Sequence, residues 1–320
     1  MSKLGVHNNH YPPGFLVLFK VSMLIELPQL VRFFIMFSGL GTIYAVYKTS
    51  RLLGFSLPAA KLAVLLLVLS PGILTNSTLD PNFIVLLPGS FALYFFLKGL
   101  ITRNILFAML MGFFFSIYTI FSFSAGFMGL LMAILFVMAW RGKLIGAFTG
   151  LCHIGASIAV FSVIYLMIYL FTGFHLLDCL QEAMRNNTAQ MSNGFDSSAR
   201  YLLRSTGAIL AYLTVVGFPQ SFLMTSALVR GFKEKPFQSW NGIFTLAVVA
   251  GLLISGFCGA FFLETERIWI FFTPALVIIA GGEVCKYYQK ENWGRIVAIL
   301  TGSLIVAFCY EIFFRPFSWR

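Results

Sequence analysis

Residues 146–172 read GAFTGLCHIGASIAVFSVIYLMIYLFT, and this stretch decides the class of fold. It contains no Asp, Glu, Lys or Arg, and it is long enough for a helix to cross a bilayer, which takes about 20 apolar residues. Similar apolar runs recur from one end of the chain to the other. A transmembrane barrel would show alternating segments of about ten residues instead. The sequence therefore predicts an all-α, polytopic membrane protein.

The composition supports a membrane protein and excludes a soluble one. Of 320 residues, 59% are hydrophobic and 10% are charged, and the mean hydropathy is +0.89. A soluble domain with so few polar side chains could not cover its surface. The net charge of +11 is spread over short loops between apolar runs, whereas a nucleic-acid binder gathers its basic residues on one soluble face. We expect no nucleic-acid partner.

We predict a single membrane domain over residues 1–320 with about ten transmembrane helices and additional interfacial helices. The predicted spans are 29–50, 58–76, 81–100, 104–120, 123–140, 146–172, 207–229, 240–263, 267–284 and 295–314. The segment 15–27 is apolar but short and carries Lys20 and Glu26, so we expect it to lie at the interface. Residues 1–28 would then form the tail of an outer loop with an interfacial helix.

The orientation follows from the basic residues in alternate loops. Five of these loops hold twelve of the 22 Lys and Arg residues: Lys48, Arg51, Lys98, Arg103, Arg141, Lys143, Arg230, Lys233, Lys235, Lys286, Lys290 and Arg295. Positive charge marks the cytoplasmic side of a membrane protein. We expect a multi-pass protein of the bacterial inner membrane, with the remaining loops on the outer face.

The outer segments hold six of the 11 acidic residues, namely Asp80, Asp178, Glu182, Asp196, Glu264 and Glu266. Charges close to a membrane are costly and gather where a polar cavity or a reaction requires them. The longest outer connection, 173–206, contains HLLDCLQEAMR, which has apolar and polar faces at helical spacing. We predict an outer loop with an amphipathic helix here, and a polar site on the outer face.

Asp80 is the first candidate for that site. It precedes Pro81 in a short outer loop, and Asp followed by Pro is typical of a helix start, with Asp as the N-cap. A carboxylate at the membrane surface can also act as a base or orient an acceptor hydroxyl. The two roles are compatible, and the sequence leaves both open.

Glu264, Glu266 and Arg267 lie together in the segment ETERIW at the start of a late span. One interpretation is a helix end with a local ion pair and an interfacial Trp269. The other is a phosphate site, because Arg binds phosphate in a bidentate manner and neighbouring carboxylates can position it.

His10 and Tyr11 precede Pro12-Pro13-Gly14, a sequence that forces an extended segment and a turn. With no matching cluster of ligands, we predict no metal site at His7 or His10. His153 lies within a span, and we interpret it as a packing or interhelical hydrogen-bonding residue. The chain contains no Walker loop, dinucleotide fingerprint, GxSxG or HExxH.

Three features stand in a familiar order: His-Tyr-Pro-Pro-Gly before an apolar segment, an Asp in a short outer loop, and Glu-Thr-Glu-Arg-Ile-Trp before a late span with an apolar FTPAL run. In this the chain resembles integral-membrane glycosyltransferases of the GT-C fold, the group that includes protein O-mannosyltransferases and aminoarabinose transferases. It looks most similar to family-39-like bacterial members. The resemblance covers nearly the whole chain through short motifs.

The resemblance implies transfer of a sugar from a polyprenyl-phosphate donor to a lipid, glycan or protein acceptor on the outer face, with inversion at the anomeric carbon. By the same resemblance, Asp80 and Glu266 would be catalytic, and His10, Tyr11, Glu264 and Arg267 would bind the substrate. The need for a divalent metal stays open.

In the family, a further span and a loop with a catalytic aspartate both precede the first motif. This chain has no acidic residue before Glu26, so we expect a fragment, a misassigned start or a degenerate member. Two other functions remain open. A transporter or flippase would carry charges deep within its spans or broken helices in matched halves. A non-catalytic, truncated membrane partner would lack the first loop.

Overall fold

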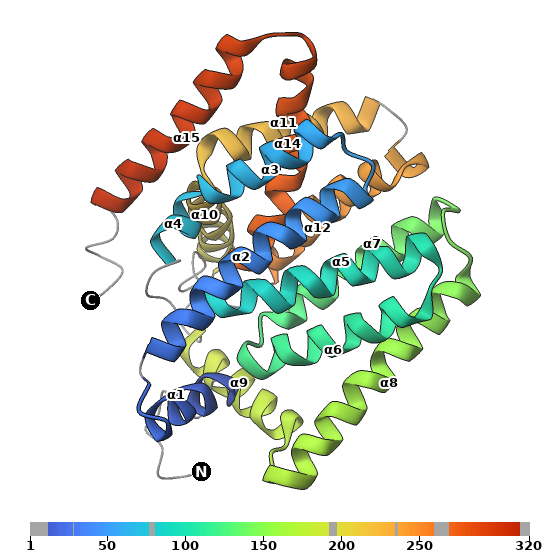
Figure 1. Cartoon of the computed structure of the whole chain (residues 1–320), viewed down its shortest axis with the longest axis vertical. Helices are drawn as coiled ribbons and strands as arrows, with labels where there is room; N and C mark the ends of the chain where they lie inside the picture. The colour runs from blue at the N-terminus through green and yellow to red at the C-terminus, as the bar shows by residue number, and fades with distance from the viewer. Residues whose placement is uncertain are drawn as a thin grey trace.

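The computed structural model describes residues 12–27, 29–76, 81–191, 197–233, 236–258 and 269–313. Within these ranges the chain is helical throughout and forms no strand (Figure 1). The all-α architecture predicted from the apolar runs is therefore confirmed.

The helices follow one another with short connections. The first nine elements are α1 (Gly14–Leu24), α2 (Gln29–Leu52), α3 (Leu57–Val68), α4 (Pro71–Asn76), η2 (Pro81–Val85), α5 (Leu86–Thr102), α6 (Ile105–Phe121), α7 (Ala125–Arg141) and α8 (Ala147–Thr172). The remaining elements are α9 (Leu176–Met191), α10 (Ser198–Val216), α11 (Phe218–Lys233), η3 (Pro236–Gln238), α12 (Trp240–Phe257), η4 (Trp269–Phe272), α14 (Thr273–Gln289) and α15 (Trp293–Phe313).

Six of the described helices are long and apolar enough to cross a membrane, and a bent pair, α10 with α11, would make a seventh. Two more predicted spans, 104–120 and 123–140, are formed by α6 and α7, which have 17 residues each. A helix of that length measures about 26 Å at 1.5 Å per residue, slightly less than the hydrocarbon core. The protein is a multi-pass integral membrane protein, although the count of ten continuous spans is not reproduced.

The predicted span 207–229 is not one continuous helix, because α10 and α11 are bent by 111° relative to each other. Gly217 separates them with a φ of +112°, which a residue with a side chain rarely adopts. The buried Gln220 fills the bend: its amide donates to the carbonyl of Leu66 and accepts from the hydroxyl of Ser303. Hydropathy averaged over a window cannot detect such a break.

The predicted span 58–76 is also interrupted, because α3 ends at Val68 and α4 starts at Pro71. Proline has no N–H to continue the helical bonding and favours a first-turn position. The hydroxyl of Ser70 donates to the carbonyl of Leu66 over 2.9 Å, within the same turn that receives Gln220. The two breaks therefore lie against each other.

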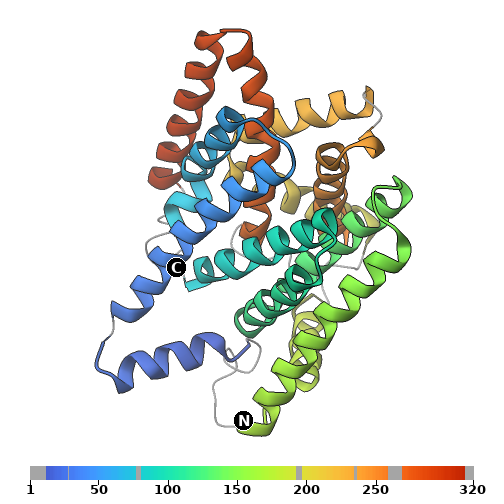
Figure 2. The same ribbon diagram turned by 45° about the vertical axis from the view of Figure 1, so that its right-hand side comes forward.

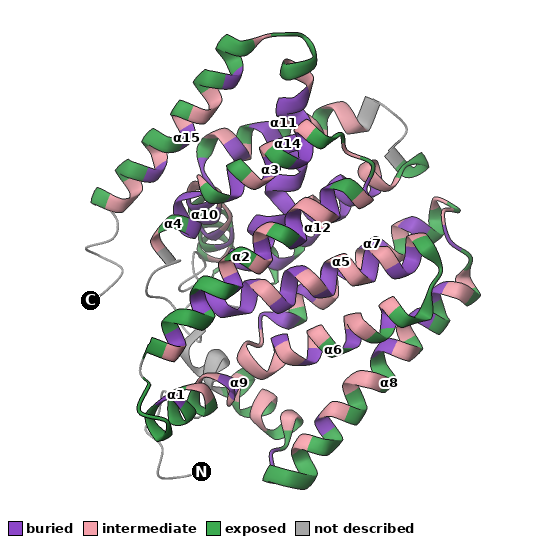
Figure 3. Ribbon diagram, viewed as in Figure 1, coloured by how far each residue is buried: buried purple, intermediate pink, exposed green. Residues whose placement is uncertain are grey.

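The centre of the bundle is α14, which packs against α3, α11 and α2. Of its most apolar window 94% is buried, against 6% for α8 and 17% for α15. Figure 3 shows the same gradient, with α14 mostly buried and the outermost helices α8 and α15 largely exposed. The helices α3 and α14 cross closely at Gly281, where a Cβ would lie 2.6 Å from the backbone nitrogen of Ala63. Small residues allow such approaches between membrane helices.

The two ends of the bundle differ in charge. The turns that carry Arg51, Arg103, Arg141, Arg230 and Lys290 all lie along the upper and right-hand edge of Figure 1. We call this edge the basic end. At the opposite end lie α1, the start of α5 and the start of α14, and Figures 1 and 2 both place α1 there, far from the α14–α15 turn. We call this the motif end, after the three motif segments that join the bundle there.

Candidate functional site

Six residues were predicted to form the site: His10, Tyr11, Asp80, Glu264, Glu266 and Arg267. All six lie outside the residues that the structure describes. Their described neighbours are Gly14, Phe83 and Trp269, each within a few positions of one motif segment. These three residues mark where the motif segments join the described bundle, and we call these places the attachment points.

The first attachment point is the start of α1. Gly14 packs so closely on the end of α6 that a Cβ there would lie 2.6 Å from the carbonyl oxygen of Ile120. The ring of Phe15 meets that of Phe121 edge to face, with centroids 5.2 Å apart. The His-Tyr-Pro-Pro-Gly segment therefore joins the bundle at the C-terminal end of α6.

The second attachment point is η2. This helix begins at Pro81, as expected from an Asp-Pro helix start. Phe83 is buried and faces Gly39 of α2, where a Cβ would lie 3.2 Å from its ring. Since η2 also packs against α5 and α6, the Asp80 loop enters the bundle beside the same end of α6.

The third attachment point is η4, whose four residues are all buried. Trp269 is 1% exposed, so the interpretation of this residue as an interfacial tryptophan is wrong. Its ring lies 5.8 Å from that of Tyr212 on α10. Phe271 lies 6.3 Å from Tyr118, which belongs to α6. The Glu-Thr-Glu-Arg segment therefore also leads into the surroundings of α6.

Neutral hydroxyl groups connect the helices at this end. The hydroxyl of Tyr118 is 2.9 Å from that of Ser124, which is 2.8 Å from the hydroxyl of Ser122. The hydroxyl of Tyr212 is 3.1 Å from that of Thr273, in the first turn of α14. These bonds link α6 to α7 and α10 to α14 close to the three attachment points.

Several buried polar atoms at or near this end have no partner among the described residues: the indole N–H of Trp269 and the hydroxyls of Ser205 and Ser255. The helices that carry them pack together, since a Cβ on Gly256 would lie 2.5 Å from Ile209 and 3.4 Å from Trp269. Buried polar groups are normally hydrogen-bonded. The described part of the motif end thus offers hydrogen-bond donors and a rigid support. The carboxylates and the arginine of the predicted site belong to the motif segments.

No three His, Cys, Asp or Glu residues gather into a metal site within the described ranges. Three of the predicted acidic residues lie outside those ranges, so the need for a divalent cation stays a prediction. In the outer connection, burial raises the pKa of the Cys179 thiol of α9. No disulfide links any of the five cysteines, all of which lie within the described ranges.

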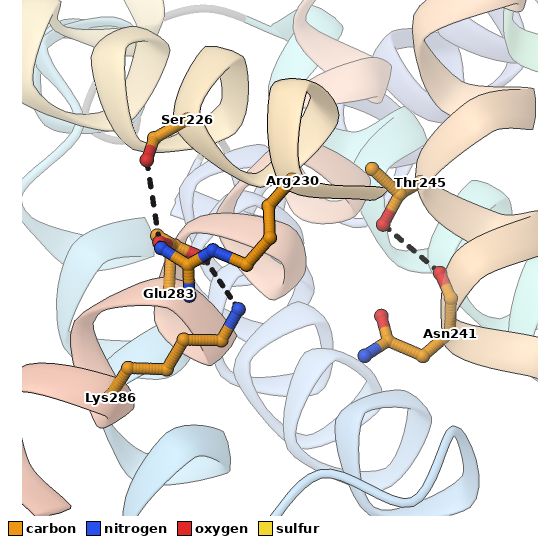
Figure 4. A network of polar contacts seen from close by, with 6 residues as sticks. All are labelled: Ser226, Arg230, Asn241, Thr245, Glu283 and Lys286. Carbon is orange, nitrogen blue, oxygen red and sulfur yellow. Dashed lines mark hydrogen bonds and ion pairs between the residues drawn. The ribbon is translucent and has the colours of Figure 1, made fainter. Parts of the chain in front are cut away.

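A second polar cluster, at the basic end, was not recognised from the sequence. The side chain of Glu283 on α14 is only 1% exposed, and it forms ion pairs with Arg230 of α11 and, over 3.1 Å, with Lys286 (Figure 4). The hydroxyl of Ser226 donates to the same carboxylate over 3.4 Å. The available signal was a Glu and a Lys three positions apart at the end of an apolar run, a spacing that places them on one helix face.

A groove of about 510 Å³ lies among α5, α6, α7 and α8. Its lining is mostly apolar, with Phe96, Met111, Phe115 and Phe136 among the residues that form it. His153 also lines it, with Nδ1 2.7 Å from the carbonyl oxygen of Thr149 and Nε2 without a partner among the described residues. The ring is buried and packs beside Gly99 of α5, as the packing interpretation predicts, while its hydrogen bond lies within its own helix rather than between helices.

The architecture can be compared with known proteins. No family model matches the chain, and no curated protein matches it. Solved structures do match it, and two of them show its fold, which is that of the GT-C membrane glycosyltransferases.

Both are oligosaccharyltransferases of the archaeon Archaeoglobus fulgidus. One is AglB in complex with an inhibitory peptide and a dolichol-phosphate, with a TM-score of 0.54 and 13% identity. The other is the enzyme in its apo form, with a TM-score of 0.55 and 14% identity. Each alignment covers 93% of this chain and 47% of the other, so the chain spans about half the length of these proteins. The predicted GT-C fold is confirmed, while the family-39 assignment within it stays a prediction.

Proposed function

We propose that this protein is a membrane glycosyltransferase that moves a sugar from a polyprenyl-phosphate donor to an acceptor at the motif end. The observation that supports the proposal is that the described residues next to the three motif segments come together at one end of a GT-C fold. Gly14 and Phe271 pack against the C-terminal part of α6, and η2, which carries Phe83, packs against the same helix. These attachment points, of which Gly14 and Phe271 are 257 positions apart in the chain, thus lie around one helix.

The proposed reaction is a displacement at the anomeric carbon of the donor sugar. The acceptor oxygen forms the new bond, the bond to the lipid phosphate oxygen breaks on the opposite face, and the configuration inverts. Asp80 and Glu266 would take up the acceptor proton or orient the acceptor. Arg267, positioned by Glu264, would neutralise the departing phosphate. His10 and Tyr11 would form a wall of the same cavity.

The donor class follows from the fold and from the membrane. One structural neighbour was solved with a dolichol-phosphate, which is a polyprenyl phosphate. In a chain that consists almost wholly of membrane helices, a donor with a lipid tail reaches the site from within the bilayer. The acceptor class, the outward orientation and the bacterial inner membrane belong to the same proposal.

A transporter is the main alternative, since α10 and α11 form a broken helix. In transporters the unwound backbone of such breaks lines a substrate cavity. Here Gln220, which is fully buried, fills the break and bonds to α3 and α15. Because these polar groups are satisfied within the protein, the break supports a structural role better than a transport site.

The test uses the protein in liposomes that contain a panel of polyprenyl-phosphate hexoses and pentoses, with a membrane extract as acceptor. The release of polyprenyl phosphate is measured. We expect Asp80→Asn and Arg267→Ala each to lower the rate at least about 100-fold. Asn caps a helix as well as Asp does, so Asp80→Asn separates the chemical role from the structural one.

Two matched controls lie in α9, in the outer connection. Asp178→Asn and Arg185→Ala make the same chemical changes at exposed positions and should keep the wild-type rate. Wild-type rates in Asp80→Asn and Arg267→Ala would contradict the site. If the unmodified protein moved intact lipid-linked sugar across the liposome membrane without cleaving it, the transporter would be the correct interpretation. No activity with any donor, beside normal insertion, would favour a non-catalytic partner.

A further inference from the structure

At the basic end, α11, α12 and α14 enclose a cavity of about 100 Å³. Arg230, Asn241, Glu283 and Lys286 are among the residues that line it. This volume is well below the 300–1,000 Å³ of sites for drug-sized ligands. It is too small for a nucleotide or a lipid-linked sugar, and it has room for a small polyatomic ion.

The charges around the cavity favour an anion. Glu283 is balanced by two cations, so the described group carries a net charge of one positive unit. The carboxylate engages one nitrogen of Arg230 and the ammonium of Lys286, whereas a guanidinium has five N–H donors and an ammonium has three. The side chains of Arg230 and Lys286 are 36% and 41% exposed, so the remaining donors are accessible.

Glu283 has a positioning role in this arrangement. A buried carboxylate between two long basic side chains restrains them, which lowers the entropy lost when they bind an anion. The hydroxyl of Ser226 supplies a further bond to the carboxylate.

The wall opposite the cations is the first turn of α12, which contributes Ser239, Asn241 and Gly242. Backbone N–H groups and the helix dipole favour negative charge at the N-terminus of a helix. In Figure 4 the side-chain amide of Asn241 points toward Glu283 and Lys286. The Gly242 N–H donates to the Ser239 hydroxyl, so the Asn241 amide and the helix dipole are what this wall offers an anion, opposite the two cations.

The aromatic side chains around the basic end indicate that the cavity lies near the lipid headgroups. Exposed aromatic side chains at the basic end, Trp140, Tyr288 and Trp293, mark the membrane–water interface. From these observations we infer that the cavity binds a phosphate group, through Arg230, Lys286 and the N-terminus of α12. The group is either free inorganic phosphate or the headgroup of an anionic lipid. The inference is independent of the proposed glycosyltransferase activity, because the cavity and the motif end lie at opposite ends of the bundle.

The test compares two substitutions that remove the same charge from the full chain. Lys286→Met removes a cation that lines the cavity, and Lys290→Met removes an exposed one that does not. Two ligands are titrated at constant ionic strength: inorganic phosphate, by the shift in melting temperature in detergent, and phosphatidic acid, by native mass spectrometry with phosphatidylcholine as reference. We expect Lys286→Met to bind about tenfold more weakly, the loss of one charged hydrogen bond, and Lys290→Met to bind as the unmodified protein does.

The outcomes separate the two sources and can overturn the inference. Binding of inorganic phosphate identifies a site for the free ion, and selective binding of phosphatidic acid alone identifies a lipid headgroup. Equal weakening by both substitutions would show a general effect of charge, and the site would be wrong. If neither ligand binds to the unmodified protein, the inference is also wrong. A second variant, Asn241→Ala, leaves all charges in place and should weaken binding without lowering the melting temperature of the free protein.

Discussion

Among the residues that the structure describes, the buried polar side chains at the motif end are neutral, whereas those at the basic end include full charges. Tyr118 and Tyr212 are completely buried, and each bonds to another hydroxyl. Glu283 is almost completely buried between two cations. A neutral hydroxyl loses little when it leaves water for a hydrogen bond, whereas a carboxylate loses much and needs an opposite charge. The motif end therefore depends on packing and the basic end on ion pairing.

The largest loss of stability is expected when an ion pair of Glu283 at the basic end is broken. Arg230→Met leaves the buried carboxylate with Lys286 alone and should destabilise the protein by about 3 kcal/mol. Glu283→Gln removes the buried charge and leaves two cations that can reach water, so it should cost only about 1 kcal/mol. Unfolding by denaturant in detergent micelles measures both values.

The double variant tests the cause of that asymmetry. If the uncompensated carboxylate is the source of the loss, Arg230→Met with Glu283→Gln should be more stable than Arg230→Met alone. Equal costs of the two single substitutions would mean that Glu283 is hydrated in the protein. The comparison of the two ends would then lose its basis.

The two ends also differ in what the sequence predicts about them. The span 146–172 agrees with α8 (Ala147–Thr172) to within one residue, because length and hydropathy alone determine a membrane crossing. The Glu283 cluster depends on the packing of α11 against α14, which joins positions 53 and 57 apart in the chain. No local pattern encodes that contact.

The breaks at Gly217 and before Pro71 were missed for a related reason. A glycine or a proline within an apolar run is also common in continuous membrane helices. What makes Gly217 a break is its positive φ and the buried Gln220 that fills the bend, and both depend on tertiary packing. The motif segments, by contrast, were recognised from the sequence, and the structure adds that their attachment points converge on α6.

At the motif end the next largest effect is steric. Gly14→Ala would place a Cβ 2.6 Å from the backbone oxygen of Ile120, and a backbone atom cannot move aside as a side chain can. We expect α1 to be displaced from α6 at a cost of about 2 kcal/mol, with a fall in sugar transfer. Trypsin cleavage at Lys20 and the melting temperature in detergent report this change.

Gly126→Ala is the matched control at the same end of the bundle. A Cβ at Gly126 meets nothing within 4 Å, so the substitution should raise stability by about 0.5–1 kcal/mol through helix propensity. The two Gly→Ala changes should thus have opposite signs. A loss of stability in both would mean that backbone freedom, rather than the contact with α6, explains Gly14.

The smallest effects are expected for the hydroxyl groups themselves. Tyr212→Phe removes the bond to Thr273 and should cost about 1 kcal/mol. Tyr118→Phe should cost less, because Ser124 keeps its bond to Ser122. The rings stay in place in both variants, so the aromatic contacts with Trp269 and Phe271 are preserved.

Neither change involves a charge, so neither cost should depend on ionic strength. The cost of Arg230→Met should depend on ionic strength, because its guanidinium is partly exposed. Denaturant unfolding at low and high salt measures this difference. A salt-dependent cost of Tyr212→Phe would show that a charged group of the motif segments lies close to Tyr212.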